Sequence, residues 1–202
     1  MNILIYVVLI LVLLLFGIFV ALFFIFTLDS LLRGHDLSTT RRASRTLIKI
    51  ILQYKPDSRN FYDLGCGRGF LVLAVKRELP YLAVYGIDNS AIRIFFSKLK
   101  SKLLGKKINF KKQDIFQTDL RNADIIYTYL WYDLMPSLEE KLQKELKRGA
   151  IVITNTSNFP TWKPKGIYIT CPKKPDFEKL FVYFDPPKFL QSKNLGGEKK
   201  GS

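Results

Sequence analysis

The sequence predicts an α/β domain with a seven-stranded, mostly parallel sheet and a C-terminal antiparallel hairpin, preceded by one transmembrane helix. Three observations predict it. Residues 3–28 form an apolar run without a single charged side chain. Beyond this run, apolar strand-like segments alternate with amphipathic ones at the spacing of βαβ units. The last two apolar segments lack a long helix between them, which predicts that they pair as a hairpin at one edge.

The N-terminal run is long enough to cross a bilayer. As a helix, residues 3–28 would span about 39 Å at ~1.5 Å per residue, against ~30 Å of hydrocarbon. A cleaved signal peptide would need a positive segment before the apolar core and small residues near a cleavage site. Neither is present, and bulky phenylalanines fill the end of the run. We therefore expect an uncleaved anchor at residues 1–30.

The charge distribution predicts how the chain sits at the membrane. Every Lys, Arg, Asp and Glu lies at Asp29 or later, so the following domain carries the whole formal charge of +15. The basic residues soon after the run place this domain on the cytoplasmic side of a single-pass protein: Arg33, Arg41, Arg42, Arg45 and Lys49. A surface this basic favours an anionic neighbour, which could be phospholipid, nucleic acid or an acidic protein.

The first half of the domain, which we place at residues 36–188, alternates helix and strand. Asp36 or Ser38 is a candidate cap for a helix running to about Gln53, because residues 47, 48, 51 and 52 form one apolar stripe. Residues 55–58 contain a proline and end it. A short strand leads into Asp63, an apolar helix runs from residue 70 to about 79, and a strand covers residues 83–88.

The second half continues the alternation and then changes. A helix over about 90–104 ends at Gly105, and the expected strands 108–111 and 124–130, helix 137–146 and strand 150–155 follow. After a proline-rich loop come the two late strands, residues 166–171 and 179–185. The polar tail, residues 189–202, is expected to be disordered. Cys66, Cys171 and the lone His35 form no metal-binding pattern, so no metal is expected and the cysteines are interpreted as ordinary thiols.

A glycine-rich turn lies between the first strand of the sheet and the next helix, at Asp63–Gly69. Glycines allow a tight turn and close approach of a ligand to the backbone, and the helix N-terminus offers unpaired N–H groups. Alone, the turn would suit a dinucleotide equally well. The turn residues expected to bind a cofactor are Asp63, Gly65, Cys66, Gly67 and Gly69.

Two further acids follow the next strands. Asp88, with Asn89 after it, ends the second strand, where a carboxylate can accept hydrogen bonds from ribose hydroxyls. Asp114 ends the third strand, where it could reach an adenine amino group while Ile115 packs on the ring. The alternative is that these acids are only turn residues. The glycine turn, the three strand-end acids and the late hairpin together resemble the class I, Rossmann-like methyltransferases, which implies S-adenosylmethionine as cofactor.

A closer resemblance extends over residues 36–185. The segments Asp63–Gly69, Ala123–Tyr127, Ser137–Leu146 and Phe159–Pro164 resemble those of the membrane-anchored protein-lysine methyltransferases that modify the c-subunit of ATP synthase and the adenine nucleotide translocase. The resemblance implies a membrane protein as substrate. One departure is Arg68, which stands where the family has an acid.

The loop after the fourth strand is the usual place for substrate contacts in such a fold. Amine-directed relatives often carry Asn/Asp-Pro-Pro-Tyr there, whereas this chain has Tyr-Leu-Trp-Tyr-Asp at residues 129–133. The missing amide counts against a nucleobase or a glutamine as substrate. Tyr129 and Tyr132 are candidates for lining a lysine channel, and Asp133 for accepting the proton. Trp131 is a candidate for substrate binding, and the resemblance implies the same role for Phe159 and Trp162. The aromatic residues after the fourth strand could instead pack the strand end, and Phe159 and Trp162 could anchor their loop.

Several functions stay open. A lipid or quinone methyltransferase would also explain the anchor, and an RNA methyltransferase would use the positive charge. The basic run at residues 98–112 is ordinarily a solvated face. It could instead contact lipid headgroups or RNA, but it lacks the interleaved aromatic residues of RNA-binding segments. A non-catalytic scaffold would not need the intact glycine turn together with all three acids.

Overall fold

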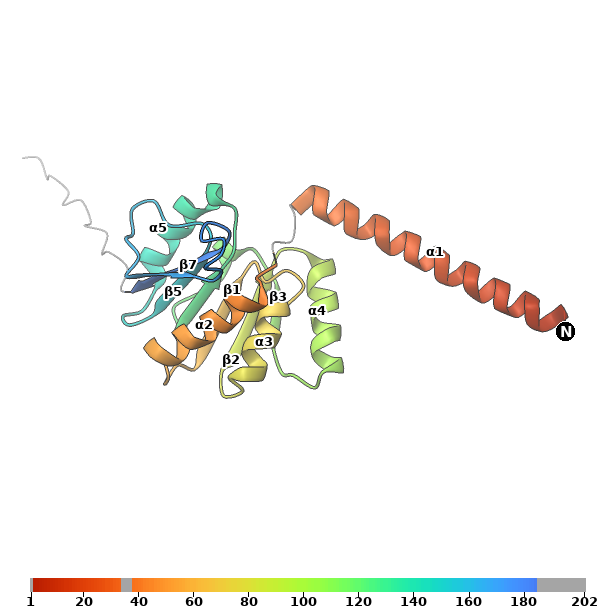
Figure 1. The fold of residues 1–202 in the computed structure, drawn as a ribbon, viewed down its shortest axis with the longest axis horizontal. Coiled ribbons are helices and arrows are strands. Elements are labelled where there is room, and N and C mark those ends of the chain that lie inside the picture. The colour runs from red at the N-terminus through yellow and green to blue at the C-terminus, as the bar shows by residue number, and fades with distance from the viewer. Residues whose placement is uncertain (1, 34–37, 185–202) are drawn as a thin grey trace, which may run out of the picture.

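The computed structural model describes residues 2–33 and 38–184, and it consists of one long helix followed by an α/β domain (Figure 1). The elements, in chain order, are α1 (Asn2–Arg33), α2 (Arg41–Tyr54), β1 (Asn60–Leu64), α3 (Phe70–Glu78), β2 (Ala83–Asp88), α4 (Ala91–Leu103), β3 (Asn109–Lys112), the 3₁₀ turn η1 (Ile115–Gln117), β4 (Ile125–Thr128), the 3₁₀ turn η2 (Tyr132–Leu134), α5 (Met135–Glu145), β5 (Ile151–Asn155), β6 (Gly166–Ile169) and β7 (Lys179–Phe184). The candidate cap Asp36, His35 and the tail 189–202 lie outside the described residues.

The seven strands form one sheet in the order β3-β2-β1-β4-β5-β7-β6. Strands β1 to β5 run parallel, and β7 pairs antiparallel with both β5 and β6. The predicted mostly parallel sheet with an antiparallel hairpin is therefore confirmed. Among the described residues, one helix is long and apolar enough to cross a membrane, judged by length and composition, and it covers Ile3–Leu31.

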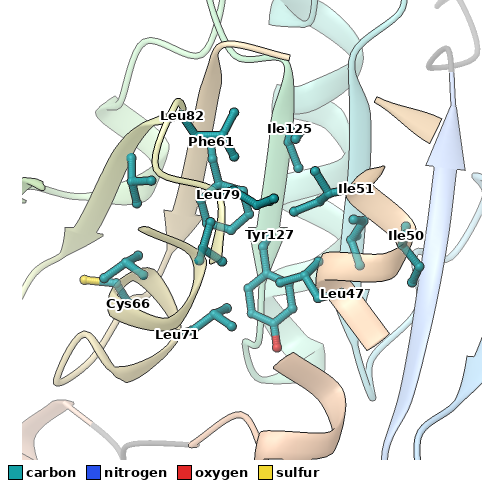
Figure 2. Close-up of a cluster of buried hydrophobic side chains, with 14 of the residues drawn as sticks. Leu47, Ile50, Ile51, Phe61, Cys66, Leu71, Leu79, Leu82, Ile125 and Tyr127 are labelled. Carbon is teal, nitrogen blue, oxygen red and sulfur yellow. The ribbon is translucent and has the colours of Figure 1, made fainter. Parts of the chain in front are cut away.

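Helices α2 and α3 cover one face of the sheet, and α4 lies beside them next to β2 and β3 (Figure 1). Alternate strand residues point to opposite faces, so Ile125 and Tyr127 of β4 face this layer. They pack with Leu47 and Ile51 of α2 and with Phe61 of β1 in one buried cluster (Figure 2). Burying such side chains stabilises the layer by roughly 1.5–3 kcal/mol each.

The other face carries α5 and the loops. Its buried cluster contains Ile126 of β4, Val152 of β5 and Tyr183 of β7, packed against Leu138 and Leu142 of α5. Between β3 and β4 the described chain has the short turn η1 where a full crossover helix would otherwise stand.

Several predicted boundaries were wrong. Thr40 caps α2, since its hydroxyl accepts a hydrogen bond from the Ala43 N–H at 3.1 Å, and Ser38 lies outside the helix. Helix α5 begins at Met135, because η2 leads directly into it and Pro136 fits the first turn. Strand β4 ends at Thr128, where its pairing with β1 and β5 stops, and not at residue 130.

Candidate active site

The carboxyl ends of neighbouring strands gather the predicted site residues along one edge of the sheet. Because the sheet order is β3-β2-β1-β4, Asp114 follows the first strand of this row, Asp88 ends the second, Asp63 lies near the end of the third, and Tyr129 follows the fourth. Strands lie ~4.8 Å apart, so the row is about 14 Å long. A ligand with separate polar parts could lie along it.

The glycine turn has a backbone that other residues could not easily adopt. Gly65, Gly67 and Gly69 all have positive φ, at 81°, 52° and 73°. The N–H groups of Gly65 and Cys66 both donate to the Ile87 carbonyl at 2.9 Å, which joins the turn to β2. A Cβ at Gly65 would lie 2.7 Å from Leu130 Cδ2. Glycine at this position therefore keeps the turn close to the loop after β4.

Asp88 is buried between the turn and α4. Its Oδ2 accepts from the Gly67 N–H at 2.9 Å, and its Oδ1 accepts from the Ser90 N–H at 2.8 Å. A carboxylate has about four lone-pair sites, so both oxygens can accept further donors. On the other side of the turn, the Ser97 hydroxyl of α4 donates to the Gly67 carbonyl at 3.2 Å. Asn89, beside Asp88, is exposed.

The end of β3 carries Asp114 and Ile115. Asp114 is exposed, and its Oδ1 accepts from the Phe116 N–H at 2.9 Å, so it caps η1. Ile115 is mostly buried in the cluster beneath the edge. Asp114 is thus accessible at this edge, whereas little of Ile115 is exposed, and adenine binding by the two residues stays a prediction.

A small cavity lies where β1 and β4 end. Asp63, which is only 3% exposed, lines it together with Gly65 and Cys66 of the turn and with Tyr127 and Tyr129. The remaining lining residues are Ser38, Thr39, Arg68, Phe70 and Leu71. The predicted channel residue Tyr129 and the predicted cofactor residue Asp63 therefore share one cavity.

A buried polar network borders this cavity, and the sequence did not reveal it. The Tyr127 hydroxyl lies 2.7 Å from that of Thr39 and accepts from Asn155 Nδ2 at 2.9 Å. Asn155 also donates to Glu178 Oε1 at 2.8 Å, and Glu178 accepts from the Thr40 hydroxyl at 2.5 Å. In Figure 2 the Tyr127 hydroxyl lies at the border of the apolar cluster.

Burial and the negative charge of Asp63 raise the pKa of Tyr127 far above its ordinary value, although the hydrogen bonds from Thr39 and Asn155 oppose the shift. The tyrosine is therefore neutral at physiological pH. From sequence alone, a tyrosine inside an apolar strand indicates only a core residue. The signals that could have pointed to the network are Asn155 at a strand end and Glu178 beside the last strand.

The other predicted substrate residues are not gathered in the cavity. Trp131, Tyr132 and Asp133 are exposed at η2. Phe159 and Trp162 are buried, with parallel rings 5.5 Å apart, and both contact the Tyr183 ring. Such burial is typical of residues that anchor a loop to the domain.

Comparison with known proteins identifies the class to which this site belongs. The family model described as ANTKMT methyltransferase domain matches residues 63–166, about half of the chain, from the glycine turn to β6. The chain belongs to this family. The predicted methyltransferase resemblance is thereby confirmed, and the ANTKMT-type domain contains the turn, all three acids and the loop after β4.

Relatives of the ANTKMT-type chain come from distant organisms. A protein-lysine N-methyltransferase of Saccharolobus islandicus is 25% identical over 64% of this chain and 80% of its own length. The adenine nucleotide translocase lysine N-methyltransferase of Mus musculus is 27% identical over 52% of this chain and 46% of its own. The ATP synthase C-subunit lysine N-methyltransferase of Xenopus laevis is 27% identical over 62% of this chain and 56% of its own. The chain thus spans about half the length of the vertebrate relatives.

The fold has counterparts among solved structures. An RNA methyltransferase of Salinibacter ruber, solved with S-adenosyl-L-homocysteine, superposes with a TM-score of 0.67 over 77% of this chain and 97% of its own, at 18% identity. This likeness concerns the fold alone.

S-adenosylmethionine is the cofactor of this methyltransferase, and the residues present fit it. The turn contains three positive-φ glycines, as expected of a backbone that a ligand approaches closely, and Gly65 packs against Leu130. Asp63 and Asp88, both buried, and exposed Asp114 beside Ile115 are the residues that would hold it, with Asp88 at the ribose hydroxyls and Asp114 at the adenine.

Proposed function

We propose that this chain methylates a lysine side chain of a membrane or membrane-associated protein, from the cytoplasmic side of a bilayer to which α1 anchors it. Three relatives are named as lysine methyltransferases. The name of one specifies the adenine nucleotide translocase, and the name of another specifies the C-subunit of ATP synthase. The observation that supports the proposal is the cavity lined by both Asp63 and Tyr129, because a lysine entering past Tyr129 would arrive beside the cofactor turn.

Positioning is the main task of the protein in this reaction. When bound, the cofactor supplies an electrophilic methyl group on a sulfonium. Asp63, the glycine turn, Asp88 and the pair at residues 114–115 would fix the two ends of the cofactor, and Tyr129 would guide the incoming amine into line. Holding both partners in place removes much of the entropic barrier of a bimolecular step.

The substrate lysine must also lose a proton before it attacks. A dry, aromatic channel disfavours the ammonium form, which lowers the pKa of the lysine, and aromatic faces hold the methylated product cation. We propose that Tyr129 lines this channel at the cavity, and that the exposed Tyr132 and Asp133 of η2 line its outer entrance, where Asp133 accepts the proton. Tyr127 joins them as a positioning residue, because its hydroxyl connects the cavity to Asn155.

Anchoring would concentrate the enzyme where its substrate lies. The apolar helix α1 meets the length requirement for a span, and the basic residues after it favour a cytoplasmic domain. Confinement to one surface raises the effective concentration of a membrane substrate without any additional contact. We accordingly propose residues 1–30 as anchor, 36–188 as methyltransferase domain and 189–202 as tail.

The test is methyl transfer from radiolabelled S-adenosylmethionine by the full chain in nanodiscs, using membranes from cells that lack its gene. Solvent extraction, nuclease treatment and acid hydrolysis separate labelled lipid, RNA and methyllysine. We expect label in methyllysine, absent with the Asp88→Ala variant and reduced with Tyr129→Ala. Label extracted with lipid would show that the substrate is a lipid, and label removed by nuclease would show that it is RNA. Either result would overturn the proposal of a lysine substrate. Binding of the cofactor without any transfer would favour the scaffold.

A further inference from the structure

The outward face of α4 carries an apolar stripe. Phe95, Leu99 and Leu103 follow one another at four-residue intervals and are 62%, 43% and 78% exposed. The opposite face of the helix, which includes Ile94 and Ser97, is buried against the domain. Because residues four apart lie on one side of a helix, the three large apolar side chains form a continuous surface. Within the described domain nothing covers it.

Lysines flank this stripe. Lys98 and Lys102 are exposed and lie next to it, three residues after Phe95 and Leu99. On the other flank, the Lys100 ammonium lies 3.5 Å from the centroid of the Phe70 ring. An apolar stripe bordered by lysines is typical of helices that lie in the interface of an anionic bilayer.

The anchor helix meets α4 at the edge of the stripe. The Phe26 ring of α1 lies 5.1 Å from the Phe96 ring of α4, and the Arg68 guanidinium lies 5.0 Å from the Phe26 centroid. Figure 1 shows α4 on the side of the domain from which α1 projects, with its axis running across that of α1. A bilayer crossed by α1 would therefore have its surface along α4.

A buried ion pair secures this junction. Asp29, one turn after Phe26, accepts a hydrogen bond from the Ser90 hydroxyl at 2.6 Å and pairs with Arg93 Nε at 2.8 Å. Both charged side chains are more than nine-tenths buried. Asp29 also lies at the N-terminus of α4, where the helix dipole favours an anion. The contacts at Phe26 and Asp29 together fix the direction in which α1 leaves the domain.

We propose that the face of α4 formed by Phe95, Leu99 and Leu103 docks on an anionic bilayer surface beside α1, so that α4 lies in the plane of the headgroups. This rests on the proposed membrane anchoring. Charge complementarity and continuity with α1 identify the bilayer as occupant. Since Ser97 and Lys100 of α4 donate to the carbonyls of Gly67 and Arg68, the docked helix directly supports the cofactor turn.

Tryptophan reporters in the full chain test this in vesicles of phosphatidylcholine and phosphatidylserine with brominated acyl chains. Phe95→Trp and Leu103→Trp report on the stripe, and Leu15→Trp reports on the anchor. Ile167→Trp, at an exposed position of edge strand β6, is the matched control. After subtraction of the emission of the unsubstituted chain, we expect bromine to quench the stripe and anchor reporters several-fold and to leave the control unchanged. A further variant that combines Lys98→Glu and Lys102→Glu with Leu103→Trp should lose most of this quenching.

The outcomes separate the two proposals. If Leu15→Trp is quenched while both stripe reporters are not, α1 anchors the protein and the docking of α4 is refuted. Absence of quenching at Leu15→Trp would instead refute the anchoring itself. A blue shift of the stripe reporters that grows with protein density, without bromine quenching, would assign the stripe to contact between copies of the chain and also overturn the inference.

Discussion

The Gly67 N–H donates a 2.9 Å hydrogen bond to Asp88 Oδ2, and this bond joins the cofactor turn to the end of β2. The other oxygen of Asp88 accepts from the Ser90 N–H. One buried carboxylate therefore shapes the turn and the start of α4 while facing the expected ribose position. Its replacement should affect the binding of the cofactor more than any nearby exposed acid would.

The Asp88→Asn variant should bind S-adenosylmethionine at least ~10-fold more weakly, a loss of about 1.4 kcal/mol. In the native chain both Asp88 oxygens accept from backbone N–H groups. The NH₂ group of an asparagine side chain would face one of these N–H groups, donor against donor, and would disturb the turn. Calorimetry on the full chain in detergent measures the affinity. Asp57→Asn, in the exposed turn after α2, is the control. Equal affinities of the two variants would refute the role of Asp88.

Alanine substitutions at Gly65 and Gly105, which both have positive φ, distinguish the effect of backbone strain from the effect of a steric clash with Leu130. Gly65→Ala adds strain and also a Cβ 2.7 Å from Leu130 Cδ2, whereas Gly105→Ala adds strain in open space. Each should lose roughly 1–2 kcal/mol of stability to strain. Only Gly65→Ala should also lose affinity for the cofactor, by calorimetry. Retained affinity in both variants would mean that the loop after β4 can move aside at no cost.

Glu139 of α5 holds the loop that contains Phe159 and Trp162. Its carboxylate, 3% exposed, accepts from the N–H groups of Thr161 and Trp162 and from the Thr161 hydroxyl. Glu139→Gln turns an acceptor into a donor that faces an N–H, and it should cost about 1–3 kcal/mol in unfolding free energy. Urea unfolding in micelles, followed by fluorescence, measures this.

Glu140→Gln is the matched control for this prediction. It removes an exposed pair with Lys144 that contributes well under about 1 kcal/mol. If both variants unfold at the same urea concentration, Glu139 does not hold the loop.

The free energy of unfolding should decrease at alkaline pH, and ionisation of Tyr127 in the unfolded chain should account for part of this decrease. Burial raises its pKa in the folded protein, so the neutral hydroxyl stabilises the fold fully below the unfolded-state pKa of ~10, and this stabilisation is lost as pH rises above it. The slope is about 1.4 kcal/mol per pH unit for one proton. Tyr127→Phe should be less stable at pH 8, because Asn155 loses an acceptor, yet its stability should decline less steeply above pH 10. Parallel profiles in urea unfolding would contradict this origin.

The features that could be predicted from the sequence are those determined by residues close together in the chain. The glycine turn, the strand ending on Asp88 and the late hairpin have signals within a few residues, and the structure has all three. The cap of α2 was misplaced because Thr40 is held by Glu178, which lies 138 residues further along the chain. No local pattern could identify that partner.

Long-range packing also explains what could not be predicted at the site. Phe159 and Trp162 have the composition of an exposed aromatic loop, but contacts with Tyr183 and Glu139 bury them. The hydroxyl of Tyr127 meets Asn155 only because β4 and β5 are neighbours in the sheet. Such residues become recognisable once the order of the strands is known.

Because the buried Asp29–Arg93 pair joins α1 to α4, we expect the proposed anchor to hold the domain rigidly and not as a flexible tether. An enzyme on a flexible tether sweeps a volume and meets targets at many distances from the membrane. A domain fixed to its own stalk would carry the methyl-donating site at one set height, and it would search for targets in two dimensions. Lysines at that height would be selected by their elevation above the lipid, with little need for a sequence motif around them.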